Sequence, residues 1–223
     1  VRVVSEYGET YFVPFGLIAA RAEQPVVSKR FTVTQPLPAS RRLSSDCIGP
    51  WNVARPKILQ GVSGDARKLL ATAASTPVPK DFQILPDHAS LTSFLNSSGT
   101  ATQGHGEGLI LLAHHNQGYL RFSDADRPPS RIGHDYITRD FRPGSVAMLA
   151  ACTTVGNVDE TSAIVNRLIR QGVDTLIVSP FAVDAEFGTR FALEFEKLVI
   201  AERASASGAS MRTLFDRAAN AVM

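Results

Sequence analysis

The chain has 223 residues, of which 44% are hydrophobic and 20% are charged, and its formal net charge is +2. This composition is typical of one soluble domain, with or without a small appended unit. No apolar run approaches the length of a membrane span, and nothing at the N-terminus resembles a signal peptide. No stripe of Arg and Lys interleaved with aromatic residues points to direct nucleic-acid binding.

The number of cysteines indicates the redox state of the compartment in which the protein works. Two cysteines, Cys47 and Cys152, are too few for a disulfide scaffold. A reducing, cytoplasmic setting is therefore expected, and it would keep a reactive thiol active. Cys47 lies among turn-forming residues, and we interpret it as incidental.

The N-terminal part predicts a β extension. Val1–Ile18 and Phe31–Thr34 are β-prone and predict a hairpin. Gln35–Pro56 is rich in Pro, Ser and Arg, and it predicts a long connection that Trp51 anchors. We therefore divide the chain into an extension with its connection, residues 1–56, and a main domain, residues 57–223. Because the sequence opens inside a strand-like segment and not with Met, we interpret it as part of a longer protein.

From residue 57 onward, strand-like and helix-like segments alternate. This alternation predicts an α/β fold with a mostly parallel sheet that helices cover on both faces. Asp124–Ile132 is expected to be an exposed loop. The expected strands are Lys57–Gly61, Phe82–Leu85, Leu109–Ala113, Val146–Cys152 and Thr175–Ser179, with a small β element at Gly118–Phe122, and the expected helices are Asp65–Ala74, Asp87–Asn96, Asp159–Gln171 and Asp184–Arg203.

Two of the expected strands end in side chains that can do chemistry. The first runs into His114 and His115, and the second ends at Cys152. Parallel strands present their carboxyl ends at one edge of the sheet, where open α/β sheets place their ligands. An imidazole beside a thiol can take its proton or stabilise the nucleophilic thiolate. The competing interpretation of Cys152 is a packed, inert thiol.

These motifs resemble the CHAT domain, a bacterial relative of caspases and separase. LLAHHNQG is similar to the strand end L-A-T-H-G of that family, and MLAACTTVG is similar to L-S-A-C-E-T-G. Gly172–Val199 resembles the segment G-A-x-x-V-I-x-S-L-W-x-V-x-D with its following helix, and Ser210–Val222 resembles the terminal helix. Gly8–Ile18 resembles the opening hairpin. The resemblance covers most of the chain and is weakest between Ala19 and Pro56.

The resemblance implies a caspase-like three-layer α/β/α sandwich with an N-terminal β-hairpin extension. It implies a cysteine endopeptidase without a cofactor, in which Cys152 is the nucleophile and His115 the general acid/base. Backbone N–H groups of Asn116 and Cys152 would form the oxyanion hole. The implied partners are a protein or peptide substrate and a sensor or regulatory module, in the same chain or in a partner protein, often in bacterial antiviral defence or cell death. Neither nucleic acid nor a membrane is expected as a direct partner.

Several positions depart from the family pattern and leave alternatives open. A one-residue shift of the strand would exchange His114 for His115. Asn116 stands where the family has Gly. Asp184 is one residue from the family's acidic position, so it is either a substrate-binding residue or, as we favour, the N-cap of the long helix. The His doublet and Asn116 also allow an inactive pseudo-peptidase that serves as an interaction scaffold.

Other chemistries lack their motifs. His88, His105 and His134 have no metal-ligand spacing, and the segment GHGEG precedes a strand, which is the wrong context for a phosphate loop. No nucleophile elbow or nucleotide-binding motif supports a hydrolase of the serine type or a nucleotide-binding domain. We also expect the isolated chain to cleave slowly, because the loops at the carboxyl edge hold few apolar anchors and would need a partner to order them.

Overall fold

A computed structural model describes residues 48–56, 59, 62, 64–98, 106–116, 119–122, 131–152, 158–178 and 184–222. For residues 115, 116, 151, 152 and 158–163 it describes the backbone alone. All of the described residues belong to one compact unit, Arg41–Met223. The predicted N-terminal hairpin lies outside the described residues.

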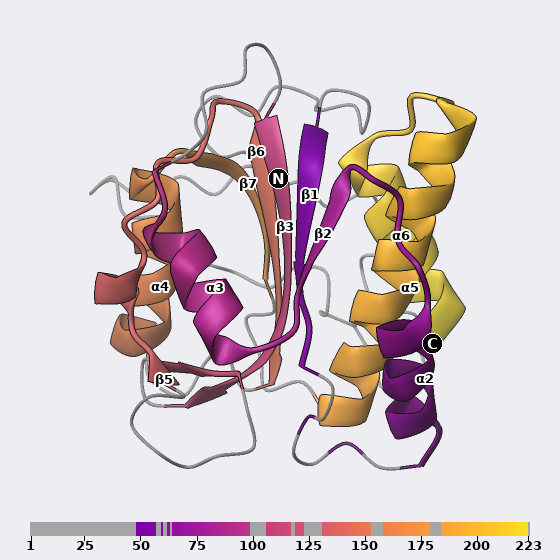
Figure 1. Ribbon diagram of the computed structural model, residues 1–223, viewed down its shortest axis with the longest axis horizontal. Helices are drawn as coiled ribbons and strands as arrows, with labels where there is room; N and C mark the ends of the chain where they lie inside the picture. Colours follow the sequence, from indigo (N-terminus) through magenta and orange to yellow (C-terminus); the bar gives the residue numbers. More distant parts are fainter. Residues whose placement is uncertain are drawn as a thin grey trace, which may run out of the picture. The chain divides into compact units, whose positions relative to one another are not determined.

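Among the described residues, seven strands form a mostly parallel sheet at the centre of this unit (Figure 1). Its parallel strands lie in the order β2-β1-β3-β6-β7, and the short strands β4 and β5 extend it in antiparallel fashion from the last residues of β3. The strands are β1 Ile48–Ala54, β2 Phe82–Leu85, β3 Gly106–Asn116, β4 Tyr119–Arg121, β5 Arg131–Ile132, β6 Ser145–Cys152 and β7 Val173–Val178.

Helices cover both faces of the sheet, which makes three layers (Figure 1). One face packs against α3 and α4, and the other packs against α2, α5 and α6. The connection from β1 to β2 runs across the sheet in the opposite direction to those from β2 to β3 and from β6 to β7. Its helix α2 accordingly lies on the opposite face from α3 and α4, as a constant crossover hand requires. The helices are α2 Gly64–Ser75, α3 His88–Asn96, α4 Val158–Arg170, α5 Ala185–Ser205 and α6 Met211–Val222, with a 3₁₀ turn η4 at His134–Tyr136. The predicted α/β fold is confirmed.

The first strand of the sheet among the described residues is β1. The strand predicted at Lys57–Gly61 lies outside the described residues except for Leu59, which is buried and is not part of a strand. β1 lies inside the segment that was interpreted as a connection, so the sheet begins before the predicted boundary at Pro56. Pro50 led to this error, because proline interrupts a regular strand. In the structure Pro50 is exposed, and the pairing of β1 with β3 shifts register between Ile48 and Trp51, a place where a strand tolerates proline.

Trp51 is part of the core and does not anchor a connection. It is fully buried and stacks on Phe82, with ring centroids 6.3 Å apart. The indole lies over Gly108 of β3, where a Cβ atom would overlap the ring. A Cβ atom at Gly106 would likewise overlap the backbone of Gly144. Close packing therefore explains the two glycines at the start of β3, Gly106 and Gly108.

The helix ends follow ordinary capping chemistry. Asp87 accepts a hydrogen bond from the backbone N–H of Ser90 at 2.8 Å, and the Ser90 hydroxyl completes a capping box, so α3 begins where the sequence predicts. These hydrogen bonds lower the pKa of Asp87. Gly172 ends α4 with a φ of 96°, a conformation that favours glycine.

Two helices each carry a pair of adjacent apolar residues of which only one is buried. Leu70 of α2 is buried but its neighbour Leu69 is exposed, and in α4 the same holds for Leu168 and Ile169. The predicted exposed loop up to Ile132 is also corrected, because Arg131–Ile132 forms β5 and Ile132 is buried. Residues 123–130 of that loop lie outside the described residues.

The Phe side chains of α5 stack along the helix and pack against α6. Phe195 is fully buried, and Phe191 stacks between it and Phe187 and meets Phe215 of α6 edge to face. Phe187, at the start of the helix, is partly exposed. Among the described residues, none of the helices combines the length and the apolar character that crossing a bilayer needs.

Candidate functional site

The carboxyl ends of β3 and β6 form the candidate site. These two strands are adjacent and parallel, and His114 is the register partner of Cys152. His115 follows one position later, beyond the last paired residue of β6. The prediction that the His-bearing and Cys-bearing strands end side by side at one edge is confirmed for the backbone. The side chains of His115 and Cys152 lie outside the described parts.

The register continues across two further strands. His114 pairs with Arg121 of β4, and Arg121 pairs with Arg131 of β5. We refer to Cys152, His114, Arg121 and Arg131 as the carboxyl-edge row. Directly opposite positions on neighbouring strands share one face of a sheet. The row therefore brings a thiol-bearing, an imidazole-bearing and two guanidinium-bearing residues to one face.

The next position along β3 belongs to a different row. His115 pairs with Leu120, and Leu120 pairs with Ile132. Both apolar side chains are buried in the core under α3 and α4. Register alone therefore gives His114 the position opposite Cys152, whereas the motif resemblance gives the catalytic role to His115.

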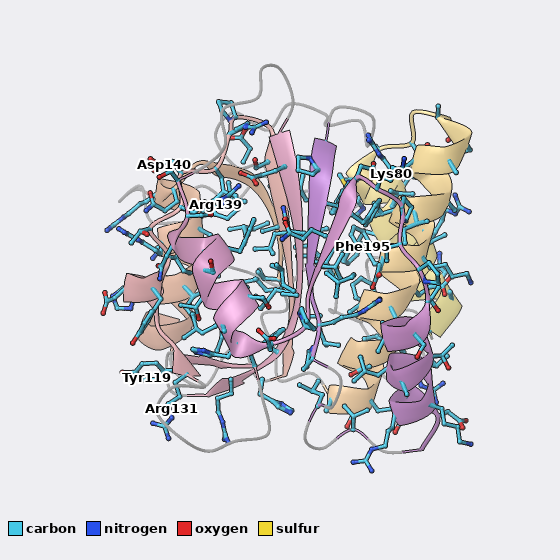
Figure 2. All side chains as sticks on the ribbon, in the orientation of Figure 1. Lys80, Tyr119, Arg131, Arg139, Asp140 and Phe195 are labelled. Atoms are coloured by element: carbon cyan, nitrogen blue, oxygen red, sulfur yellow. The ribbon has the colours of Figure 1, made fainter. Side chains whose placement is uncertain are left out.

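An exposed aromatic side chain borders the row. Tyr119 of β4 pairs in register with Asn116, and its ring lies against Gly133, where a Cβ atom would approach the ring to 3.2 Å. The Tyr119 side chain is 43% exposed. Figure 2 shows Tyr119 and Arg131 at the same end of the molecule, beside the short strands β4 and β5.

Asp184 is the N-cap of α5, as the sequence analysis favours. Its carboxylate accepts hydrogen bonds from the backbone N–H groups of Glu186 at 3.0 Å and Phe187 at 3.1 Å. These contacts explain the acidic residue at this position through helix capping. The segments between β6 and α4 and between β7 and Asp184, which belong to the loops expected to need a partner for ordering, lie outside the described residues.

A buried ion pair joins the end of β1 to the layer of α2 and α5. Arg55, directly after β1, contacts both carboxylate oxygens of Glu196 through one nitrogen, at 2.5 and 2.7 Å. A second nitrogen donates to the carbonyl of Ala73 at the end of α2, at 2.6 Å. Burial raises the pKa of Glu196, although the attraction of Arg55 opposes this shift. The pair connects the first strand to the helices on that face.

Sequence reasoning missed the two arginines of the row. It identified a β element at Gly118–Phe122 but did not predict that this element pairs with the His-bearing strand, so Arg121 had no assigned neighbour. Arg131 was placed in an exposed loop. The available signal was alternation: Arg121 and Arg131 are next to the apolar residues Leu120 and Ile132. In a strand, neighbouring side chains point to opposite faces, so the two arginines lie on the face opposite to Leu120 and Ile132.

No metal centre is found within the part of the chain that the structure describes, where no three His, Cys, Asp or Glu residues gather as ligands. Comparison of the chain with family models, with curated proteins and with solved structures finds no match. The function is therefore argued from the residues of the carboxyl edge.

Proposed function

We propose that the chain is a cysteine endopeptidase, similar to CHAT domains, in which Cys152 is the nucleophile and His115 the general acid/base. The observation that supports this proposal is the parallel pairing of β3 with β6. It brings the His114–His115 doublet, at the end of β3, next to Cys152, at the end of β6. The two strand ends are far apart in the sequence but adjacent at the carboxyl edge of the sheet, where α/β proteins hold their ligands.

The chemistry follows from the residue types. The Cys152 thiolate attacks the scissile carbonyl carbon, a C–S bond forms, and backbone N–H groups of Asn116 and Cys152 stabilise the oxyanion. When the intermediate collapses, the C–N bond breaks and the protonated imidazole gives its proton to the leaving amine. Water then attacks the thioester and gives a proton to the imidazole. The peptide acid leaves, and the thiolate and the protonated imidazole are restored.

The biological setting belongs to the same proposal. A reducing, cytoplasmic compartment fits a free catalytic thiol. A sensor or regulatory module, in the same chain or in a partner protein, would control cleavage of a protein substrate in a defence or cell-death response. The family resemblance supports this setting. If the loops of the site are ordered only in the active arrangement, a partner can activate it by binding that arrangement more tightly. A difference of only a few kcal/mol is enough to shift the population strongly.

Replacement of each histidine in turn tests the proposal. His115→Gln is expected to lower the cleavage of an unfolded protein such as reduced, alkylated casein by about a hundredfold or more, since general acid/base catalysis contributes about that much. His114→Gln is the matched control and should retain most of the activity. Fragments are measured by mass spectrometry at enzyme concentrations comparable to the substrate.

The two variants separate three outcomes. Loss of cleavage in His114→Gln alone would reassign the base to the register partner of Cys152 and keep the peptidase. Full cleavage in both variants would contradict the proposed dyad. Absence of any cleavage by the unmodified chain, together with an unreactive Cys152, would favour the pseudo-peptidase scaffold.

A further inference from the structure

We infer that Arg131, together with Arg121, binds an acidic side chain of the substrate close to the scissile bond. This inference rests on the proposed peptidase function and names the substrate class of the same site: peptides that carry Asp or Glu near the cleaved bond. The carboxyl-edge row carries it, because the row joins the two arginines to Cys152 through direct register partners.

The row also sets the distance over which the arginines can act. Neighbouring strands lie about 4.8 Å apart, so three strand intervals put the backbone of Arg131 about 14 Å from that of Cys152. An extended peptide advances about 3.3 Å per residue, so this span corresponds to about four residues of a substrate. The acidic residue therefore lies within about four positions of the scissile bond.

The charges of the row indicate an anionic ligand. Arg121 and Arg131 are directly opposite each other on antiparallel strands, and like charges at such positions destabilise the pair. A carboxylate bound beside the two arginines could accept paired hydrogen bonds from the exposed guanidinium of Arg131. Arg121 is half-buried and has other interactions within the chain, whereas Arg131 is exposed. Arg131 is therefore the residue whose replacement reports on substrate binding.

The aromatic side chain beside the row provides an apolar surface for the same peptide. Tyr119 lies two positions from Arg121 on β4, on the same face by strand alternation, and its exposed ring rests on Gly133. An exposed aromatic ring next to cationic groups offers apolar contact to the peptide stem while the arginines bind the carboxylate.

Binding to a Cys152→Ala form of the chain tests the inference without requiring turnover. The probes are short fluorescent Ala-Ser peptides that carry two adjacent Glu residues, and counterparts with Gln at the same places. We expect the Glu peptides to bind about tenfold more tightly by fluorescence anisotropy, as for hydrogen bonds to charged groups. Arg131→Gln should remove this preference. Arg170→Gln, which changes an exposed arginine at the last residue of α4, should keep it.

The outcomes separate this inference from the peptidase proposal. Equal binding of Glu and Gln peptides, or a Glu preference that survives Arg131→Gln, would overturn the arginine site. Cleavage by the unmodified chain without a preference for acidic peptides would also overturn it and leave the peptidase standing. Arg131-dependent binding of Glu peptides with an inert Cys152 would support the arginine site and contradict the peptidase.

Discussion

Replacing Cys152 by Ala is expected to abolish peptide cleavage while the chain keeps its fold. Removal of the nucleophile from an enzyme of this mechanistic type lowers turnover by about 10⁴-fold or more. The measurement is the release of casein fragments by the variant and by the unmodified chain at equal concentration. Circular dichroism and the unfolding midpoint of the two forms should agree closely, since Ala is smaller than Cys by a single sulfur atom.

Cys47→Ala is the matched control for this prediction. The variant removes the other thiol of the chain and should leave cleavage nearly unchanged. If Cys47→Ala abolished cleavage and Cys152→Ala did not, the assignment of the nucleophile would be wrong. The pairing of β6 with β3 would then be only a structural feature of the sheet.

Arg55→Met is expected to destabilise the fold by about 3–5 kcal/mol at neutral pH, because it leaves the Glu196 carboxylate buried without its partner. Arg55 and Glu196 side chains are only 6% and 5% exposed. The measurement is the free energy of unfolding from urea titrations at several pH values. Few other single changes in the described residues remove a charge partner from so deep a position.

The pH dependence of this penalty has a definite sign. Burial already raises the pKa of Glu196, and the loss of Arg55 removes the groups that oppose this shift. A carboxyl group with a raised folded-state pKa stabilises the folded state below its unfolded pKa, and this contribution is lost as the pH rises through the folded pKa. The penalty of Arg55→Met should therefore shrink as the pH falls from neutral towards acid.

Glu196→Gln is the matched control, because it leaves the buried guanidinium, which stays charged throughout this range. Its penalty should not shrink as the pH falls, because the variant lacks the carboxyl group whose raised pKa stabilises the unmodified chain at acid pH. A pH-independent penalty for Arg55→Met would contradict the account of the raised Glu196 pKa. A penalty near zero would show that the pair contributes little to stability.

The sequence predicted those parts of the fold whose signals are local. Asp87 and Ser90 form the capping box that starts α3, and Asp184 caps α5, because a side chain and a backbone N–H three residues apart decide such ends. The apolar runs that end at Ala113 and Cys152 predicted two central strands. In a parallel sheet, strands buried on both faces carry continuous apolar sequences.

Other features depend on pairing between distant segments, which one sequence does not reveal. β1 was missed because Gly49 and Pro50 resemble a turn, and only its position between β2 and β3 makes it a strand. Arg131 was assigned to a loop because β5 has two residues and no pattern of its own. The choice between His114 and His115 depends on a one-residue register, which strand periodicity by itself does not fix.

The alkylation rate of Cys152 as a function of pH tests the central claim most directly, because it needs neither a substrate nor an activator. The chain is treated briefly with iodoacetamide at each pH, and mass spectrometry follows Cys152 and Cys47 as separate peptides of the same molecule. A thiol activated by a neighbouring imidazole should titrate clearly below the ordinary value of about 8.5, and Cys152 should react faster than Cys47 at neutral pH. Alkylation of Cys152 that rises only around or above that value, and that is no faster than alkylation of Cys47, would contradict a catalytic thiol at the carboxyl edge.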